Sequence, residues 1–493
     1  MAKHILAIDQ GTTGSTALVV SLEGETLGRA STEFEQHYPK PGWVEHDVGE
    51  IWASVEASVK EAIKAAKILP TDIAAIGITN QRETTVVWDK KSGQPIAHAI
   101  VWQCRRTADT CDALKKAGHE ELVKKKTGLV IDAYFSATKV AWLLDNVDGA
   151  RARADRGELA FGTIDSFLVH RLSGGDKHVT DVTNASRTLL CDIQKVAWDD
   201  ELCTLFRVPK NMLAEIVSSA EVVAHTKGVG FLPDGIAVAG IAGDQQAALF
   251  GQACFDEGDA KCTYGTGAFA LMNIGTKSLR STHGLVTTIA WKVGGEVVYA
   301  LEGSAFIAGA AVQWLRDGLG IIESAADIEP LARKVSSSDG CVFVPALAGL
   351  GAPYWDQAAR GTITGITRGT TAAHLARATL EGIAFEVGDL LTAMTKDASR
   401  EITTLKVDGG AAKNDLLMQF QADLLGVAIE RPTDVESTGR GAAMLAAVGA
   451  GLAEPGDAAK LIKKDATFTP QMAKGERDAH LASWRAAITK TRA

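Results

Sequence analysis

At 493 residues the chain is longer than one hydrophobic core usually organises, so we expect two large domains or three small ones. Hydrophobic residues make up 46% and charged residues 23%, a globular composition that excludes disorder, a disulfide scaffold and a coiled coil as descriptions of the whole chain. With 51 Lys and Arg against 60 Asp and Glu, the net charge of −9 gives no global positive field for nucleic acid or anionic lipid.

The uncharged runs and the cysteines indicate in which cellular compartment the protein is found. The runs 341–355 and 441–453 are shorter than a membrane span and contain Gly or Pro, and Asp9 interrupts the first apolar stretch before a signal-peptide core forms. The seven cysteines are scattered, without a Cys-x-x-Cys pair. We therefore expect a cytoplasmic chain with reduced, packed cysteines and no membrane insertion.

The first 80 residues predict a meander, a helix and a further strand. Apolar residues 4–8, the polar turn 9–14 (DQGTTG) and apolar residues 17–22 indicate two strands joined by a glycine-containing hairpin, with a third strand near 25–34. From Asp47 onward apolar residues recur with helical spacing, and Asp47 and Glu50 form a capping-box pair. A buried strand is expected at 73–79.

Strands and helices then alternate, which is typical of an α/β structure whose helices cover a mostly parallel sheet. A strand is expected at 235–242 and a helix at 245–251. The second half adds an apolar segment at 303–315, a long amphipathic helix at 372–394, a strand-turn-helix at 405–425 and a terminal helix beyond residue 465.

A short internal similarity suggests duplication. Residues 262–267 (CTYGTG) and the apolar run 268–272 repeat the strand, Gly-Thr turn and strand of residues 9–22, about half the chain away. A match this short can also arise by chance. Read as duplication, it predicts an N-terminal domain at 1–253 and a C-terminal domain at 254–493.

The two Gly-Thr turns are candidates for phosphate binding. Their backbone N–H groups and hydroxyls can surround phosphate oxygens, and Asp9 at a strand end can hold Mg²⁺ directly or through water. Neither turn has the sequence of a Walker or a Rossmann motif. The alternative for each Gly-Thr turn is therefore an ordinary hairpin turn exposed to solvent. If Thr12 and Thr13 face Thr266 across a cleft, they can grip one triphosphate from both sides.

Other candidates follow the ends of predicted strands. Asp244 stands where an apolar strand gives way to a helix; there it either accepts a proton from an attacking hydroxyl or caps the helix. Arg82 and Glu83, which follow strand 73–79, suit a polyhydroxylated substrate or form an exposed turn pair. Gly410 before Asn414 either lets a purine approach the backbone or belongs to an ordinary turn.

The chain resembles the FGGY carbohydrate kinases over about residues 5–470. The residues that carry the resemblance are DQGTT (9–13), PGWVEH (41–46), GITNQRET (77–84), WQCRR (102–106), TNASRT (183–188), GIAGDQQAALFGQ (240–252) and GLGAPYWD (349–356), with the two general family signatures at 134–146 and 361–381.

The resemblance implies two actin-like, ribonuclease-H-like domains with the active site in a central cleft. It places the substrate and phosphate side on the domain at 1–253 and the nucleotide side on the domain at 254–493. It also implies transfer of the γ-phosphoryl group of MgATP to a terminal hydroxyl of glycerol, giving sn-glycerol 3-phosphate. Asp244 would be the base that positions the hydroxyl in line and takes its proton late. Domain closure would exclude bulk water.

The resemblance assigns further residues to substrate and nucleotide. The glycerol hydroxyls would be bound by Arg82, Glu83, Tyr134, Asp244 and Gln245, and the carbon skeleton would pack against Trp102 and Phe269. The ATP site would comprise Thr12, Thr13, Gly14, Thr266, Gly309, Gln313, Gly410 and Asn414, with Asp9 engaging Mg²⁺ through water.

The sequence departs from the family pattern at two places. Thr16 stands where a basic residue usually follows the hairpin, which predicts weaker nucleotide or product binding. Segment 224–235 contains Lys227 but no Arg, and His225 lacks the neighbours of a phosphorylated loop, so neither inhibition by fructose 1,6-bisphosphate nor activation by histidine phosphorylation is expected.

Two alternative functions stay open, and the resemblance also bears on the oligomeric state. A kinase for another polyol or a ketopentose would share the fold, and an actin-like ATPase without a small-molecule acceptor would share the nucleotide site. Because relatives are often dimers or tetramers, the resemblance also implies a homo-oligomer.

Overall fold

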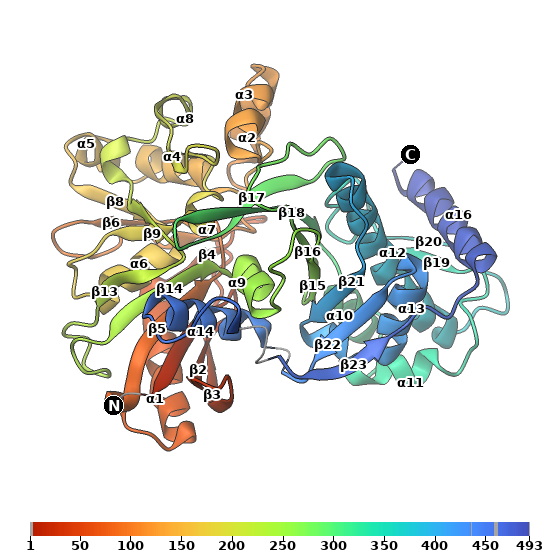
Figure 1. Cartoon of the computed structure of the whole chain (residues 1–493). Coiled ribbons are helices and arrows are strands. Elements are labelled where there is room, and N and C mark those ends of the chain that lie inside the picture. Colours follow the sequence, from red (N-terminus) through yellow and green to blue (C-terminus); the bar gives the residue numbers. More distant parts are fainter. Residues whose placement is uncertain (1–2, 435, 458–461, 493) are drawn as a thin grey trace.

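The computed structural model describes residues 3–434, 436–457 and 462–492, and its framework is two mixed β-sheets, one in each half of the molecule (Figure 1). The six-stranded sheet has the order β13-β14-β5-β1-β2-β3 and the seven-stranded sheet the order β17-β18-β16-β15-β21-β22-β23. Strands of the first sheet are β1 (His4–Gln10), β2 (Gly14–Ser21), β3 (Thr26–Glu33), β5 (Ile73–Asn80), β13 (Ala220–His225) and β14 (Ala237–Gly243). Strands of the second are β15 (Ala260–Tyr264), β16 (Ala268–Asn273), β17 (Val286–Val293), β18 (Glu296–Ala305), β21 (Thr404–Asp408), β22 (Ala428–Pro432) and β23 (Lys464–Phe468).

Helices cover these sheets, and short strand pairs lie outside them. The helices are α1 (Val48–Ala66), α2 (Ala108–Lys116), α3 (Glu120–Thr127), α4 (Ser136–Asn146), α5 (Ala150–Asp155), α6 (Ile164–Leu172), α7 (Val182–Ala185), α8 (Asp200–Leu205), α9 (Asp244–Gly251), α10 (Gly309–Asp317), α11 (Ile328–Ala332), α12 (Ala372–Ala398), α13 (Asp415–Leu425), α14 (Ser437–Gly449) and α16 (Lys474–Thr491). The strand pairs are β4 (Glu45–His46) with β7 (Ala99–Ile100), β6 (Val86–Asp89) with β8 (Leu159–Gly162), β9 (Val179–Asp181) with β12 (Glu215–Val217), β10 (Cys191–Asp192) with β11 (Ala197–Trp198), and β19 (Val342–Val344) with β20 (Thr362–Thr364).

The two sheets share one topology. In the first, β1 pairs antiparallel with β2 and parallel with β5, and β5 pairs parallel with β14. In the second, β15 pairs antiparallel with β16 and parallel with β21, and β21 pairs parallel with β22. The two hairpins expected from the sequence thus occupy the same place in both halves. This confirms the α/β class and the actin-like duplication, while the exact boundary at 253/254 stays a prediction.

The first sheet is buried on both faces, which explains its continuous apolar runs. Successive side chains of a strand point to opposite faces. Leu6 and Ile8 of β1 pack in the core that includes the apolar side of α1, whereas Ile5 and Ala7 pack with Ala443 of α14.

Helix α14 crosses back from the C-terminal half of the chain to cover the N-terminal sheet (Figure 1). Its approach depends on glycine, because a Cβ at Gly77 or Gly240 would overlap the main chain of α14. A Cβ at Gly441 of α14 would likewise overlap the carbonyl oxygen of Ala247 in α9. The main chain of α14 therefore packs directly on the main chain of β5, β14 and α9.

The structure corrects two local expectations. Helix α1 does begin after Asp47, whose Oδ1 accepts a hydrogen bond from Gly49 N at 2.7 Å, but Glu50 does not close a capping box. Its Oε2 instead lies 3.6 Å from His37 Nε2. The terminal helix begins only at Lys474, since residues 464–468 form β23 at the edge of the second sheet.

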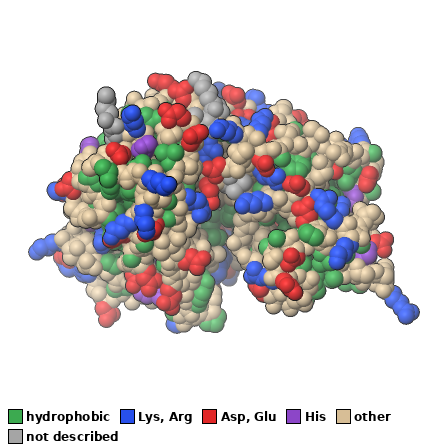
Figure 2. All heavy atoms as spheres, turned by 90° about the horizontal axis from the view of Figure 1, so that it is seen from below, with side chains coloured by type: hydrophobic (Ala, Val, Ile, Leu, Met, Phe, Trp, Pro, Cys, Tyr) green, Lys and Arg blue, Asp and Glu red, His purple; other side chains and the backbone are tan. Residues whose placement is uncertain are grey.

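Two further expectations concern the cysteines and the surface. All seven cysteines are unpaired and buried. Within the described part of the chain, no helix is long and apolar enough to cross a membrane. On the face shown in Figure 2, acidic and basic side chains are interspersed and the surface is notched between the two halves of the molecule.

Candidate active site

Arg82 lies just past the end of β5 and is the hub of a buried cluster of charges. Its Nη1 and Nη2 donate to the two carboxylate oxygens of Glu302 at 2.6 and 2.8 Å. Its Nε lies 3.2 Å from Asp244 Oδ1, and its Nη2 is 3.4 Å from the Tyr134 hydroxyl. The expected exposed-turn alternative is therefore wrong, because Arg82 is 3% and Glu83 1% exposed.

Two members of this cluster were not singled out from the sequence. Arg187 Nε donates to Glu83 Oε1 at 2.6 Å, and Arg187 Nη2 donates to Glu302 Oε1 at 3.0 Å. Burial alone would raise the pKa of Glu302, but Arg187 and Arg82 together lower it to about 2. Arg187 lies inside the TNASRT stretch, which was a usable signal. Glu302 lies on β18, and no sequence motif pointed to it.

Glu83 has an uncommon backbone for a residue that is not glycine. Its φ of 61° lies in the left-handed region, where the backbone of a residue other than glycine is strained. Burial raises the pKa of Glu83, and the charges of Arg187 and Arg82 oppose that shift. The turn thus holds a carboxylate in place on Arg187, next to the guanidinium of Arg82.

Asp244 is the first residue of α9, directly after β14. Its Oδ1 accepts a hydrogen bond from Gln245 N at 2.7 Å and faces the Arg82 Nε, so it reaches the charge cluster. The N-cap position of α9 is Gly243 and has no side-chain cap hydrogen bond, so the expectation that Asp244 merely caps the helix is wrong. About a third of its side chain is exposed, with a relative accessibility of 32%. A carboxylate with this access can receive a proton from a bound hydroxyl.

The aromatic candidates join the two halves. Trp102 Nε1 donates to Thr12 Oγ1 at 3.0 Å, and the Trp102 ring makes edge contacts with Tyr134 and Phe269, with centroids 5.6 and 6.5 Å apart. Phe269 lies on β16 of the second sheet, so Trp102 spans from the N-terminal hairpin to the C-terminal half. These three rings form an apolar wall beside the Arg82 cluster.

The nucleotide-side candidates lie on the second sheet and its helices. Ala308 N and Ala310 N donate to Thr266 O at 2.8 and 3.0 Å, which fixes the β15–β16 turn on the start of α10. A Cβ at Gly309 would lie 2.7 Å from Gly265 O, so only glycine fits there. Gln313, one turn further along α10, is exposed.

Gly410 and Asn414 frame the start of α13. A Cβ at Gly410 would meet no atom within 4 Å, so this backbone borders open space. Asn414 caps α13, its Oδ1 accepting from Leu417 N at 2.9 Å. This capping bond gives Asn414 a structural role that does not require a bound nucleotide.

The first hairpin is less uniform than expected. Thr12 is held by Trp102, whereas Thr13 is exposed. Gly14 has a packing reason of its own, since a Cβ there would lie 2.8 Å from Thr32 O on β3. No hydrogen bond joins Thr12 or Thr13 to Thr266 among the described residues. The gripping of one triphosphate from both sides stays a prediction.

Asp9 on β1 has the character of a cation-binding carboxylate. Burial and the charges of Asp244 and Glu436 raise its pKa to about 8, against the lowering effect of Arg29. Its carboxylate accepts no hydrogen bond from any described residue. A divalent cation would relieve the repulsion between Asp9 and Asp244, so the residues present fit Mg²⁺.

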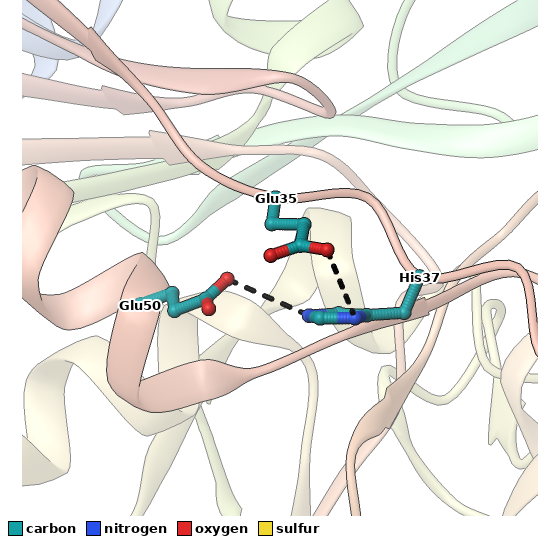
Figure 3. A group of neighbouring side chains, drawn as sticks. All are labelled: Glu35, His37 and Glu50. Carbon is teal, nitrogen blue, oxygen red and sulfur yellow. Dashed lines mark ion pairs between the residues drawn. The ribbon is translucent and has the colours of Figure 1, made fainter.

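A second group of acids and histidine lies elsewhere. Within residues 3–434, 436–457 and 462–492, the one set of three such side chains close enough to share a cation is Glu35, His37 and Glu50 (Figure 3). His37 lies 4.0 Å from Glu35 and 3.6 Å from Glu50, and these two ion pairs account for the arrangement without a metal.

Known proteins resemble this chain over its whole length. Residues 4–251 match the N-terminal domain, and residues 260–450 the C-terminal domain, of the FGGY family of carbohydrate kinases. A glycerol kinase of Myxococcus xanthus is 56% identical over 492 residues, covering 99% of both chains, and one of Oceanobacillus iheyensis is 55% identical over 491 residues, covering 99% of this chain and 98% of its own.

Solved structures agree with these matches. The glycerol kinase of Plasmodium falciparum, solved with ADP, superposes with a TM-score of 0.92 at 37% identity, covering 99% of this chain and 98% of that one. A xylulose kinase of Lactobacillus acidophilus superposes with a TM-score of 0.89 at 22% identity over 99% of this chain and 97% of its own, a likeness of fold alone.

Proposed function

Because the chain belongs to the FGGY family of carbohydrate kinases, we propose that it transfers the γ-phosphoryl group of ATP to a terminal hydroxyl of glycerol, giving sn-glycerol 3-phosphate. The observation that carries the proposal is the convergence of Arg82, Tyr134 and Asp244 beside the wall of Trp102 and Phe269. Donors, an acceptor and an apolar surface together suit a small polyol. The glycerol kinases that match the chain over nearly its full length support this choice of substrate.

Asp244 acts as the general base in this proposal. Its carboxylate accepts a hydrogen bond from the attacking hydroxyl, directs the oxygen at the γ-phosphorus and receives the proton. Because phosphoryl transfer has a loose transition state, most of its effect comes from positioning. Arg82, Glu83, Tyr134 and Gln245 bind the hydroxyls, and Arg82 Nε, 3.2 Å from Asp244 Oδ1, keeps the base oriented.

ATP binds across both halves in this proposal. Thr12, Thr13, Gly14 and Thr266 contact the phosphates, Gly309 and Gln313 line the nucleotide site, and Gly410 and Asn414 border the adenosine. The open space in front of Gly410 supports the last assignment. Asp9 holds Mg²⁺ through water, and the bound cation neutralises charge on the phosphates. Closure of the two halves excludes water from the reacting groups.

The test is ADP release by wild type and Asp244→Asn, measured with glycerol, with other polyols and ketopentoses, and without an acceptor. The exposed Asp148→Asn is the matched control. Turnover that needs glycerol and collapses only in Asp244→Asn supports the proposal. Preference for another acceptor moves the specificity within the family, and acceptor-independent turnover refutes the kinase assignment.

We also propose that the protein is a cytoplasmic homo-oligomer, a dimer or a tetramer, as the resemblance implies. Sedimentation velocity of the purified full chain measures this directly. A monomer at micromolar concentration would contradict it.

A further inference from the structure

Lys261 is a buried ammonium group that the proposed mechanism leaves without a role. It lies on β15 in the middle of the second sheet and is fully buried. Its Nζ donates to Gln245 Oε1 at 2.5 Å and to Thr263 Oγ1 at 2.8 Å, and lies 3.5 Å from Phe269 O. No carboxylate of the described residues lies within 4.0 Å of it. Burying a charged group without an opposite charge in contact with it is costly, so the presence of Lys261 here calls for an explanation.

Lys261 bridges the two halves at the site. Gln245 belongs to α9, directly after the proposed base Asp244, whereas Thr263 and Phe269 belong to the second sheet. Burial lowers the pKa of Lys261, and the charge of Asp408 is the largest of the influences that oppose this shift. All the direct partners of the ammonium are neutral oxygens.

The chemistry of the two side chains fixes the orientation of the Gln245 amide. An ammonium group only donates hydrogen bonds, so the amide oxygen must face Lys261. The Nε2 group is then turned away, and it donates to no acceptor among the described residues. Gln245 is 6% exposed and its Oε1 is held by Lys261, so the side-chain amide has little freedom to rotate.

We propose that Lys261 is a positioning residue that acts through Gln245. By occupying Gln245 Oε1, it presents Nε2 as a donor to an oxygen of the polyol bound beside Asp244. A hydroxyl can both donate and accept, so a freely rotating amide would bind it in two ways. Lys261 selects the one in which the substrate oxygen accepts. This inference rests on the proposed function.

Lys406 offers a matched control. It is paired with Lys261 in register on the adjacent strand β21, but its Nζ donates to the main-chain oxygen of Ala253 at 2.8 Å. Lys261→Met is expected to raise the KM for glycerol about tenfold, the effect of one well-placed hydrogen bond, with the KM for ATP within about twofold of wild type. Lys406→Met should leave the KM for glycerol unchanged.

A double-mutant cycle separates positioning from a structural role. If Lys261 acts through Gln245, adding Lys261→Met to Gln245→Ala raises the KM for glycerol no further. Additive effects, or a single Lys261→Met with the wild-type KM, would overturn the inference. Wild-type enzyme without glycerol-dependent ADP release would refute the proposed function instead.

Gln245→Glu keeps the inference testable even if Lys261→Met does not fold. The new carboxylate pairs with Lys261 and offers no donor to the substrate. We expect a melting temperature at least equal to that of wild type, together with a KM for glycerol raised as far as in Gln245→Ala. An unchanged KM for glycerol in Gln245→Glu would overturn the inference.

Discussion

Replacing Glu302 with glutamine is expected to destabilise the protein more strongly than any other single loss of a carboxylate near the site. Glu302 receives three charge-assisted hydrogen bonds, two from Arg82 and one from Arg187, at 2.6, 2.8 and 3.0 Å. With Glu83, the four side chains form a buried group with no net charge. The substitution leaves this group with one uncompensated positive charge and turns an amide NH₂ toward a guanidinium.

The magnitude follows from the burial of the group. All four side chains are at most 3% exposed, so solvent screens little of the charge. Removing one partner of a buried ion pair costs about 3–5 kcal/mol. Because 1 kcal/mol shifts the melting temperature of a domain of about 200 residues by about 2–4 °C, a decrease of about 6–20 °C is expected.

Thermal melts followed by circular dichroism measure this change, and Arg187→Gln completes the cycle. Removing both charges restores neutrality, so the double variant should be less destabilised than the sum of the two single variants by more than about 1 kcal/mol. A Glu302→Gln variant that melts within about 2 °C of wild type would refute the reasoning that the cluster is desolvated.

Three further perturbations test separate features. Thr16→Arg supplies a cation beside the first hairpin and should lower the KM for ATP about threefold; an unchanged value counts against a missing phosphate contact. Burial and the charge of Asp389 raise the pKa of Glu386 to about 8, so the unfolded chain binds fewer protons and stability falls as the pH rises from about 4.5 to 8. The Glu386→Gln variant should therefore have a higher melting temperature than wild type at pH 8.5 but not at pH 4.5. An equal rise in melting temperature in the variant Glu401→Gln, at an exposed position, would show that burial of Glu386 is not the cause. Gly441→Ala should cost about 1–3 kcal/mol in a denaturant titration, because its methyl group overlaps α9; wild-type stability would show that α14 can shift without cost.

Local patterns predicted most of the framework. The apolar runs at 4–8 and 17–22 are β1 and β2, and the strand-to-helix change before Asp244 is the junction of β14 and α9. These elements depend on neighbours along the chain, so their periodicity is visible in the sequence. β23 was missed because it pairs with one strand only, and three of its five residues are not apolar.

The site was predictable where a motif coincided with a strand end. Arg82 and Asp244 follow β5 and β14, whose carboxyl ends meet at one edge of the sheet. Glu302 is different, because its importance comes from bonds to a guanidinium 220 residues away in the sequence. No local pattern carries that information.

The return of α14 to the N-terminal sheet has a consequence for synthesis of the chain. The last strand of that sheet ends at Gly243, but the helix that covers one face ends at Gly449. At ribosomal rates of about 5–20 residues per second, that face waits about 10–40 s for its cover. During this time the apolar side chains of Ile5, Ala7, Leu18 and Val20 are without their helix. Until α14 is synthesised, the nascent N-terminal half therefore exposes an apolar sheet face of the kind that promotes aggregation.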